Sequence, residues 1–166
     1  MDNTARRANV EGSIREHVRV MLASTFGSDY GAIDYGGGEP FDDTQFAEWL
    51  QVRFLERAQH FVGHANTTQM GRAYFVMLNL NIFVRPAKLA TLNTLRLTTL
   101  ADSVRDVFQP TQRIEVKNYA GDSASLGHLI VDDHERDSAV TPAEREQELQ
   151  QWNLVVSLRW TELWTA

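Results

Sequence analysis

The chain has 166 residues, 43% of them hydrophobic and 23% charged; because this length can bury roughly 70% of the unfolded surface, we predict one domain spanning residues 1–166. The formal net charge of -6, without a Lys/Arg cluster denser than Arg6 and Arg7, argues against a surface that follows a nucleic-acid backbone and favours protein partners. The chain has no cysteine, which excludes disulfides and cysteine-bound zinc. It also has no apolar run near ~20 residues and no apolar signal core, so we predict a cytosolic product without membrane contact.

The first predicted element is an amphipathic helix over residues 10–26. Its apolar positions recur at helical spacing between charged residues and are Val10, Ile14, Val18, Met21, Leu22 and Phe26. Gly27 is the expected C-cap. Glycines and a proline in residues 27–43 then predict an irregular connection around a short extended piece at residues 32–35. The glycine run at residues 36–38 lacks the Lys-Ser/Thr ending of a phosphate loop, so we interpret it as a plain loop.

Residues 72–84 form the predicted central strand. One face carries an unbroken apolar row, composed of Tyr74, Val76, Leu78, Leu80, Ile82 and Val84. The opposite face bears Asn79 and Asn81 between apolar ends, which indicates a side that is covered only in part. Residues 49–55 alternate as a second strand, and we expect this strand to form a hairpin with the first through a long loop at residues 59–70.

The second half of the chain adds a helix and three strands. Apolar residues recur on one side of a helix over residues 92–108, which ends before Pro110. Strands are predicted at residues 113–119, 125–133 and 152–160, while the charged residues 134–148 are expected to form an exposed loop. We therefore predict an α+β domain, a mostly antiparallel sheet with two helices packed on one face.

Side chains that could bind a metal are concentrated near residues 128–137. In a regular strand, His128, Asp132 and His134 would share one face, and further carboxylates follow at Asp133, Glu135 and Asp137. Acidic residues at a strand end more often form a solvated rim, so we predict no metal site here.

Other patterns of catalysis or metal binding are equally weak. His60 and His64 have the i, i+4 spacing of helical ligands, but Gly63 between them argues against a helix. No G-x-S-x-G elbow is present, and the carboxylates of Asp132 and Asp133 would point to opposite faces of a strand. We therefore expect no enzyme activity and no cofactor.

The four tryptophans suggest where the chain contacts other proteins. Trp152 and Trp160 share the apolar face of the last strand and are predicted to lie in the core. Trp49 is on the face opposite Leu50, and Trp164 is near the chain end. Because outward aromatic groups often anchor protein interfaces, Trp49 and Trp164 are candidates for a contact between subunits.

The layout of nearly the whole chain resembles that of the tail terminator (tail completion) proteins of long-tailed bacteriophages. The first shared feature is an amphipathic N-terminal helix, and the others come after it in the chain. They are Pro-Phe at residues 40–41, a strand opened by Trp-Leu-Gln-Val at residues 49–52, Gly-Arg-Ala-Tyr-Phe-Val at residues 71–76, a helix ending in Val-Phe at residues 107–108, and a closing strand written Trp-Asn-Leu-Val-Val at residues 152–156. The charged stretch at residues 134–148 is longer than a minimal member of that family would need.

This resemblance implies a ring-shaped homo-hexamer in the virion, assembled in the host cytoplasm and placed at the head-proximal end of the tail. Such a ring would cap the tail tube protein, stop its polymerisation and offer a docking surface to the head-tail connector protein, while DNA would pass through the lumen without specific binding. A ring closes through a heterologous interface and so needs outward apolar groups. The interface residues that we expect are Trp49, Phe75, Met77, Phe83, His60, His64 and Trp164. Loops at residues 59–70 and 133–148 could reach the tube or the connector.

Two other functions fit the same sequence. The first is a head-tail connector or neck protein of similar fold, which would differ in its partner and not in its chemistry. The second belongs to another class, a domain that binds a small ligand in a pocket between sheet and helices lined by Tyr74, His128 and Trp160.

Overall fold

The computed structural model describes residues 6–26, 32–36, 40–63, 69–85, 90–119, 121, 123–140 and 149–165. For residues 6–7, 56–63, 69–74, 90–93 and 161–165 it describes the backbone. The elements in chain order are α1 (Arg6–Leu22), β1 (Ile33–Asp34), the 3-10 helix η1 (Asp43–Gln45), β2 (Glu48–Gly63), β3 (Gln69–Val84), α2 (Ala90–Val107), β4 (Arg113–Lys117), β5 (Ser125–Val140) and β6 (Gln150–Thr165).

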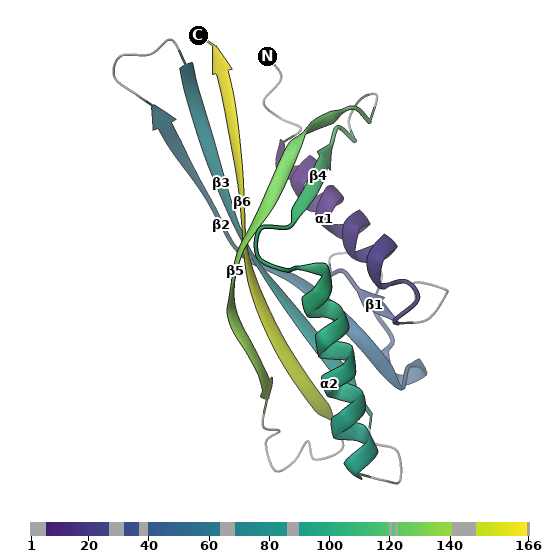
Figure 1. The fold of residues 1–166 in the computed structure, drawn as a ribbon. Coiled ribbons are helices and arrows are strands. Elements are labelled where there is room, and N and C mark those ends of the chain that lie inside the picture. Colours follow the sequence, from purple (N-terminus) through teal and green to yellow (C-terminus); the bar gives the residue numbers. More distant parts are fainter. Residues whose placement is uncertain are drawn as a thin grey trace.

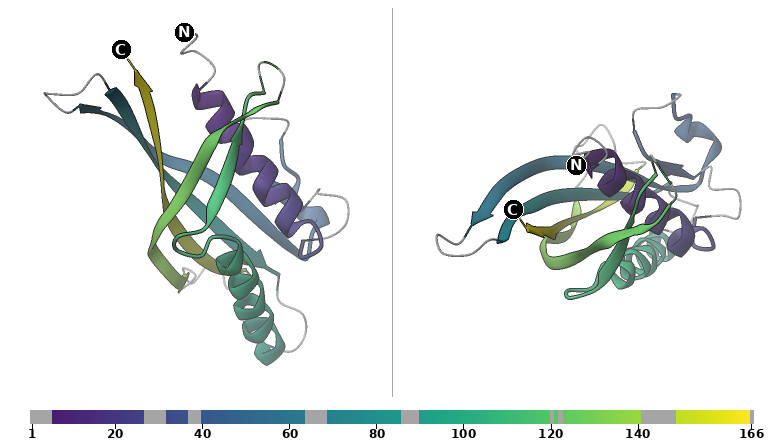
Figure 2. Two further views of the ribbon diagram at one scale, coloured as in Figure 1. Left: turned by 45° about the horizontal axis from the view of Figure 1, so that its top comes forward. Right: turned by 90° about the horizontal axis from the view of Figure 1, so that it is seen from above.

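The strands form one curled six-stranded sheet in the order β1-β2-β3-β6-β5-β4 (Figure 1). Only the short β1 pairs in parallel with its neighbour, and the other pairs of described strands are antiparallel. Both α-helices lie on the same side of the sheet (Figure 2). The predicted α+β class, with a mostly antiparallel sheet and helices on one face, is therefore confirmed. No described helix is long and apolar enough to span a membrane.

The strand β3 is central, as its alternating pattern predicts, with β2 on one side and β6 on the other. The described members of its apolar row are buried, and those at residues 78, 80 and 82 have no exposed surface. In the register of the sheet, Leu80 lies between Val52 of β2 and Leu154 of β6. The apolar row of β3 is thus the middle of a core that all three strands share and that the helices cover.

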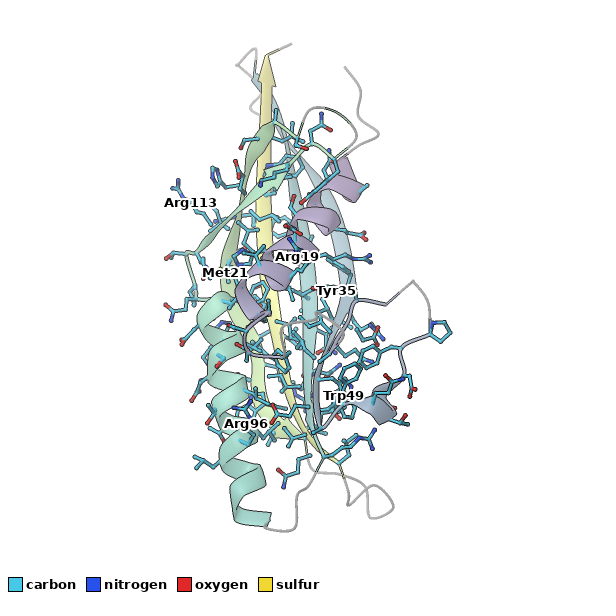
Figure 3. All side chains as sticks on the ribbon, turned by 90° about the vertical axis from the view of Figure 1, so that its right-hand side faces the viewer. Arg19, Met21, Tyr35, Trp49, Arg96 and Arg113 are labelled. Atoms are coloured by element: carbon cyan, nitrogen blue, oxygen red, sulfur yellow. The ribbon has the colours of Figure 1, made fainter. Side chains whose placement is uncertain are left out.

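The helix α1 packs through a narrow stripe of residues spaced four apart. Val10, Ile14, Val18 and Leu22 are buried, and Phe26 extends the stripe beyond the helix end. The prediction that Met21 belongs to this face is wrong, because Met21 is 48% exposed and lies on the outer side of α1 (Figure 3). A residue three positions after Val18 lies at the flank of a stripe that follows the i, i+4 direction, so solvent reaches it.

Polar side chains of α1 also complete the outer edge of the sheet at β4. The hydroxyl of Ser13 accepts a hydrogen bond from the backbone N–H of Lys117 at 2.9 Å, and Oδ1 of Asn9 accepts one from the N–H of Tyr119 at 2.9 Å. Both polar side chains are buried. Gly12 lies between them, and a Cβ there would come within 3.0 Å of the Tyr119 ring. The helix α1 therefore satisfies two outward N–H groups at the end of this edge of the sheet.

The contact between α1 and the end of α2 is made by a half-buried histidine. Nε2 of His17 lies 3.2 Å from the carbonyl oxygen of Val107, and the His17 ring meets the ring of Phe108 edge-on at 5.8 Å. Burial lowers the pKa of His17, and the hydrogen bond to Val107 opposes this effect only in part. The neutral imidazole, donating from Nε2, is therefore the form that the fold favours.

Parts of two predicted loops are in fact strands. The charged residues 134–140, expected in an exposed loop, continue β5 to Val140, and the expected loop at residues 59–70 is shortened by β2, which reaches Gly63, and by β3, which begins at Gln69. Charged side chains are tolerated in a strand at the margin of a sheet, since only one of its faces is buried. Their presence alone therefore does not indicate a loop.

A truncation of the central row should destabilise the fold strongly. We expect Leu80→Ala to lower the free energy of unfolding by about 2–5 kcal/mol, because it opens a cavity at a fully buried position. Leu95→Ala is the matched control on α2, where the side chain is 65% exposed, and it should change stability by less than about 0.5 kcal/mol. Urea denaturation followed by circular dichroism measures both, and equal effects would contradict the assignment of the core.

The protein should become less stable as the pH falls below the ordinary pKa of histidine. Because the folded pKa of His17 lies below its ordinary value of 6.5, its contribution is fully present above pH 6.5 and is lost as the pH falls through the folded pKa. His17→Gln keeps an N–H donor for Val107 but cannot titrate. Denaturation midpoints measured between pH 7.5 and pH 5 should therefore fall less steeply for this variant, whereas parallel curves would show that His17 has no part in the loss.

Candidate functional site

The side of the sheet away from the helices carries a row of amide side chains. In the register of the sheet, Gln51 of β2, Asn81 of β3 and Asn153 of β6 lie directly opposite one another. Asn79 and Gln151 are their diagonal neighbours on the same face. We call these five residues the amide row.

Asn81 is the centre of the amide row. Its Nδ2 donates to Oε1 of Gln51 at 3.2 Å, and its Oδ1 accepts from Nε2 of Gln151 at 3.0 Å and from Nδ2 of Asn153 at 2.7 Å. Nδ2 of Asn153 also donates to Oδ1 of Asn79 at 2.5 Å. Asn81 and Asn153 are each only 7% exposed, although no described helix covers this face. The amides therefore satisfy one another and leave few groups free for a ligand.

The amide row is continued to β1 by an ion pair. Nε2 of Gln51 donates to Oδ2 of Asp34 at 3.4 Å, and Nη2 of Arg53 lies 2.5 Å from the same oxygen. Burial alone would raise the pKa of Asp34, but hydrogen bonds from Arg53, from the N–H of Gly36 and from Gln51 outweigh it and hold the pKa below its ordinary value. Asp34 is therefore a charged anchor that ties the short edge strand to β2.

An aromatic stack closes one end of the amide row. The rings of Trp49 and Phe83 are stacked with centroids 4.9 Å apart, and the guanidinium of Arg85 lies 5.1 Å from the centroid of Trp49. Arg85 is held by the carbonyl oxygen of Phe46 at 3.1 Å, next to η1. Trp49 is consequently only 3% exposed. Trp49 therefore lies on the face opposite Leu50, as the sequence predicts, and side chains of its own chain cover it there.

The other end of the amide row remains apolar and open. Phe75 is 38% exposed and Met77 is half-buried, and both point to the outer face as their alternation with the core row predicts. Leu55, which is 56% exposed, lies close by at a β-bulge between Phe54 and Glu56. Leu55 was not predicted as a contact residue, although two successive apolar residues at 54 and 55 interrupt the alternation of β2 and indicate the bulge.

The candidate metal ligands of β5 are engaged separately and do not converge. Asp132 pairs with Arg159 at 3.3 Å, Asp137 with Arg105 at 2.5 Å, and Nε2 of His134 lies 2.7 Å from the carbonyl oxygen of Phe108. Two bulges, between residues 131 and 133 and between residues 134 and 136, break the shared face that a regular strand would give. Among the residues whose side chains are described, no group of three or more His, Asp or Glu could hold a metal ion.

Asp137 has a structural role on the helical face of the sheet. It accepts a hydrogen bond from Nε1 of Trp152 at 2.7 Å in addition to the one from Arg105. These hydrogen bonds, that from Arg105 above all, outweigh burial and hold the pKa of Asp137 below its ordinary value. A charged carboxylate thus connects α2 to β5 and β6.

The remaining predicted site residues are either separated or lie outside the described part. His64 is among the residues that the structure does not describe, and so are the side chains of His60, Trp164 and Tyr74. His128 is exposed, whereas Trp160 is 3% exposed and belongs to the core, as predicted. His128 and Trp160 therefore do not line a common pocket.

The amide row should contribute to stability through Asn81 more than through Asn79. Asn81→Ala leaves Gln51, Gln151 and Asn153 short of partners, and we expect a loss of about 1–3 kcal/mol. Asn79→Ala removes one described side-chain hydrogen bond at a more exposed position and should cost less than about 1 kcal/mol. Urea denaturation measures both. The double variant Asn81→Ala/Asn153→Ala should cost less than the sum of its parts, and additivity would show that the two amides act independently.

Comparison with known proteins reveals a likeness in fold and none in sequence. No protein-family model matches the chain, and no curated protein matches it either. Among solved structures, a chain of the "Virion of native gene transfer agent (GTA) particle" is similar in fold, with a TM-score of 0.52 and 12% sequence identity, over 95% of this chain and 98% of that one. The likeness thus extends over both chains almost completely, and at this identity it establishes a shared fold.

Proposed function

We propose that this protein is a structural component of a phage-like virion and that it acts as a tail terminator. The observation that carries the proposal is the likeness of fold, over nearly the full length of both chains, to a chain of a gene transfer agent virion. The sequence layout that resembles tail terminators is independent support. In this function several copies form a ring that caps the tail tube and offers its other side to the head.

The chemistry of the outer face suits docking better than catalysis. The amide row is neutral and internally hydrogen-bonded, so it presents neither a nucleophile nor a charged group to a substrate. Next to it, Leu55, Phe75 and Met77 expose apolar surface that a neighbouring protein could bury. Of the expected interface residues whose side chains are described, Phe75 and Met77 are therefore the ones that we propose as contacts between subunits. Such contacts would act by excluding water and not by chemistry.

A head-tail connector of similar fold is the second candidate. The likeness is to a chain of a virion particle and implies no position within that particle, so it favours neither the tail terminator nor the connector. The two roles differ in what the protein binds, and one set of binding measurements separates them.

The capping role predicts an effect on tube length. When the purified chain is added to its tail tube protein during polymerisation, tubes seen by electron microscopy should be shorter and should carry extra density at one end. Phe75→Asp should weaken this effect at least tenfold in the concentration required, because it places a charge in the proposed contact. Leu95→Asp, at an exposed site on α2 on the other side of the sheet, is the matched control and should cap normally.

Two results would count against the capping role. Tubes of unchanged length, together with co-sedimentation of the chain with filled heads and not with tails, would favour the connector. Binding to neither would overturn a role in the neck altogether.

A further inference from the structure

Three paired strands continue beyond the body of the molecule. The two outer strands of this extension each have one unpaired edge. The antiparallel pairing of β3 with β2 and β6 runs to residues 69–73, whereas β5 last pairs with β6 at Arg159 and β1 pairs with β2 only at residues 50–51. At this end of the sheet, which carries the C-terminus, β2, β3 and β6 extend past both helices (Figure 1). Within the described chain, residues 56–63 of β2 and residues 161–165 of β6 therefore have a strand partner on one side only.

The other margins of the sheet are protected in part. Ser13 of α1 accepts a hydrogen bond from the N–H of Lys117 at the end of β4, Asn9 accepts one from the N–H of Tyr119 just beyond it, and β1 pairs with β2 at residues 50–51. The free margin of β5 at residues 133–140 has bulges and charged side chains, two devices with which natural proteins prevent strand pairing. The two open edges of the extension differ from these margins, because no helix or further strand pairs with them in the described chain.

We infer that the open edge of β6 at residues 161–165 pairs with the open edge of β2 at residues 56–63 in a second copy of this chain. The inference rests on the proposed function and names the contact by which its ring would close. Each edge presents backbone N–H and C=O groups that only another strand can satisfy in regular order. Because the two edges lie on opposite flanks of one sheet, their contact is heterologous, repeats from copy to copy and can close into a ring.

The direction of the new pairing follows from the order of the strands. Both β2 and β6 are antiparallel to β3, so they run in the same direction. A neighbour that continues the sheet sideways, with its core face on the same side, places its β2 beside β6 in that direction. The seam between copies is therefore parallel, whereas pairing of β6 with another β6 across a two-fold axis would be antiparallel and would end at a dimer.

The absence of cysteine from the chain permits a direct test by disulfide trapping. One set of variants places a thiol on β2 (Gln59→Cys), and another places it on β6 (Thr161→Cys, Leu163→Cys or Thr165→Cys). Glu135→Cys, on the protected margin of β5, is the control. The chain is assembled at high concentration or on its tail tube protein, oxidised mildly, and resolved without reductant.

The inferred seam predicts a specific pattern of cross-links. The β2 variant mixed with one of the β6 variants should give a disulfide dimer at least tenfold more abundant than any variant alone or any mixture with Glu135→Cys. The chain that carries both thiols should give a ladder that stops at one closed species. Dimers from a β6 variant alone, cross-links to Glu135→Cys, or monomers under every condition would each overturn the inference.

Proline substitutions exclude the possibility that a variant simply fails to fold. In an antiparallel strand, successive N–H groups point to alternate sides, so of Glu162→Pro and Leu163→Pro one removes a hydrogen bond to β3 and the other an N–H of the open edge. The variant that removes an N–H of the open edge should keep the melting temperature of the parent protein and should lose assembly. If neither variant separates assembly from stability, the edge is not the contact. Cross-links of the inferred pattern in a ring that does not cap tubes would refute the capping role and leave the seam intact.

Discussion

The structure depends on the pairing of β3 along both of its sides. Because β2 and β6 flank it from end to end, its backbone groups are satisfied within the sheet, and its side chains alone decide what each face becomes. One face is wholly apolar and receives both helices. The other is held by amides that bond across three strands. A single strand thereby determines which side of the molecule is core and which side is available to other molecules.

The helices are attached by polar contacts as well as by the core. The bidentate pairing of Arg96 with Glu48, at 2.7 Å for each oxygen, connects α2 to the start of β2, and Arg105 connects it to Asp137. At the opposite margin, α1 is fixed through Asn9 and Ser13. Because these bonds are directional, they set the position of each helix along the sheet, which apolar packing alone would leave less well defined.

Sequence patterns predict those parts of the fold where one periodicity dominates. The apolar row of β3 and the buried stripe of α1 follow from spacing alone, and so does the alternation of core and outward residues in β6. Patterns do not predict β5 beyond residue 133, because two bulges interrupt its alternation and its charges resemble those of a loop. The sequence also does not predict that Trp49 is covered, since the covering side chain, Arg85, is distant in sequence. Likewise, the asparagines of the amide row are visible in the sequence, but their partners Gln51 and Gln151 emerge only from the register.

The bulge at Leu55 gives the extension its geometry. One strand of the hairpin gains a residue there and its partner does not, which bends the bulged strand and increases the local twist. The direction in which the free end of the sheet leaves the body thus depends in part on a difference in residue number between two strands. Related chains could therefore diverge widely in sequence at this point and retain the same curvature, whereas the loss of one residue would flatten it.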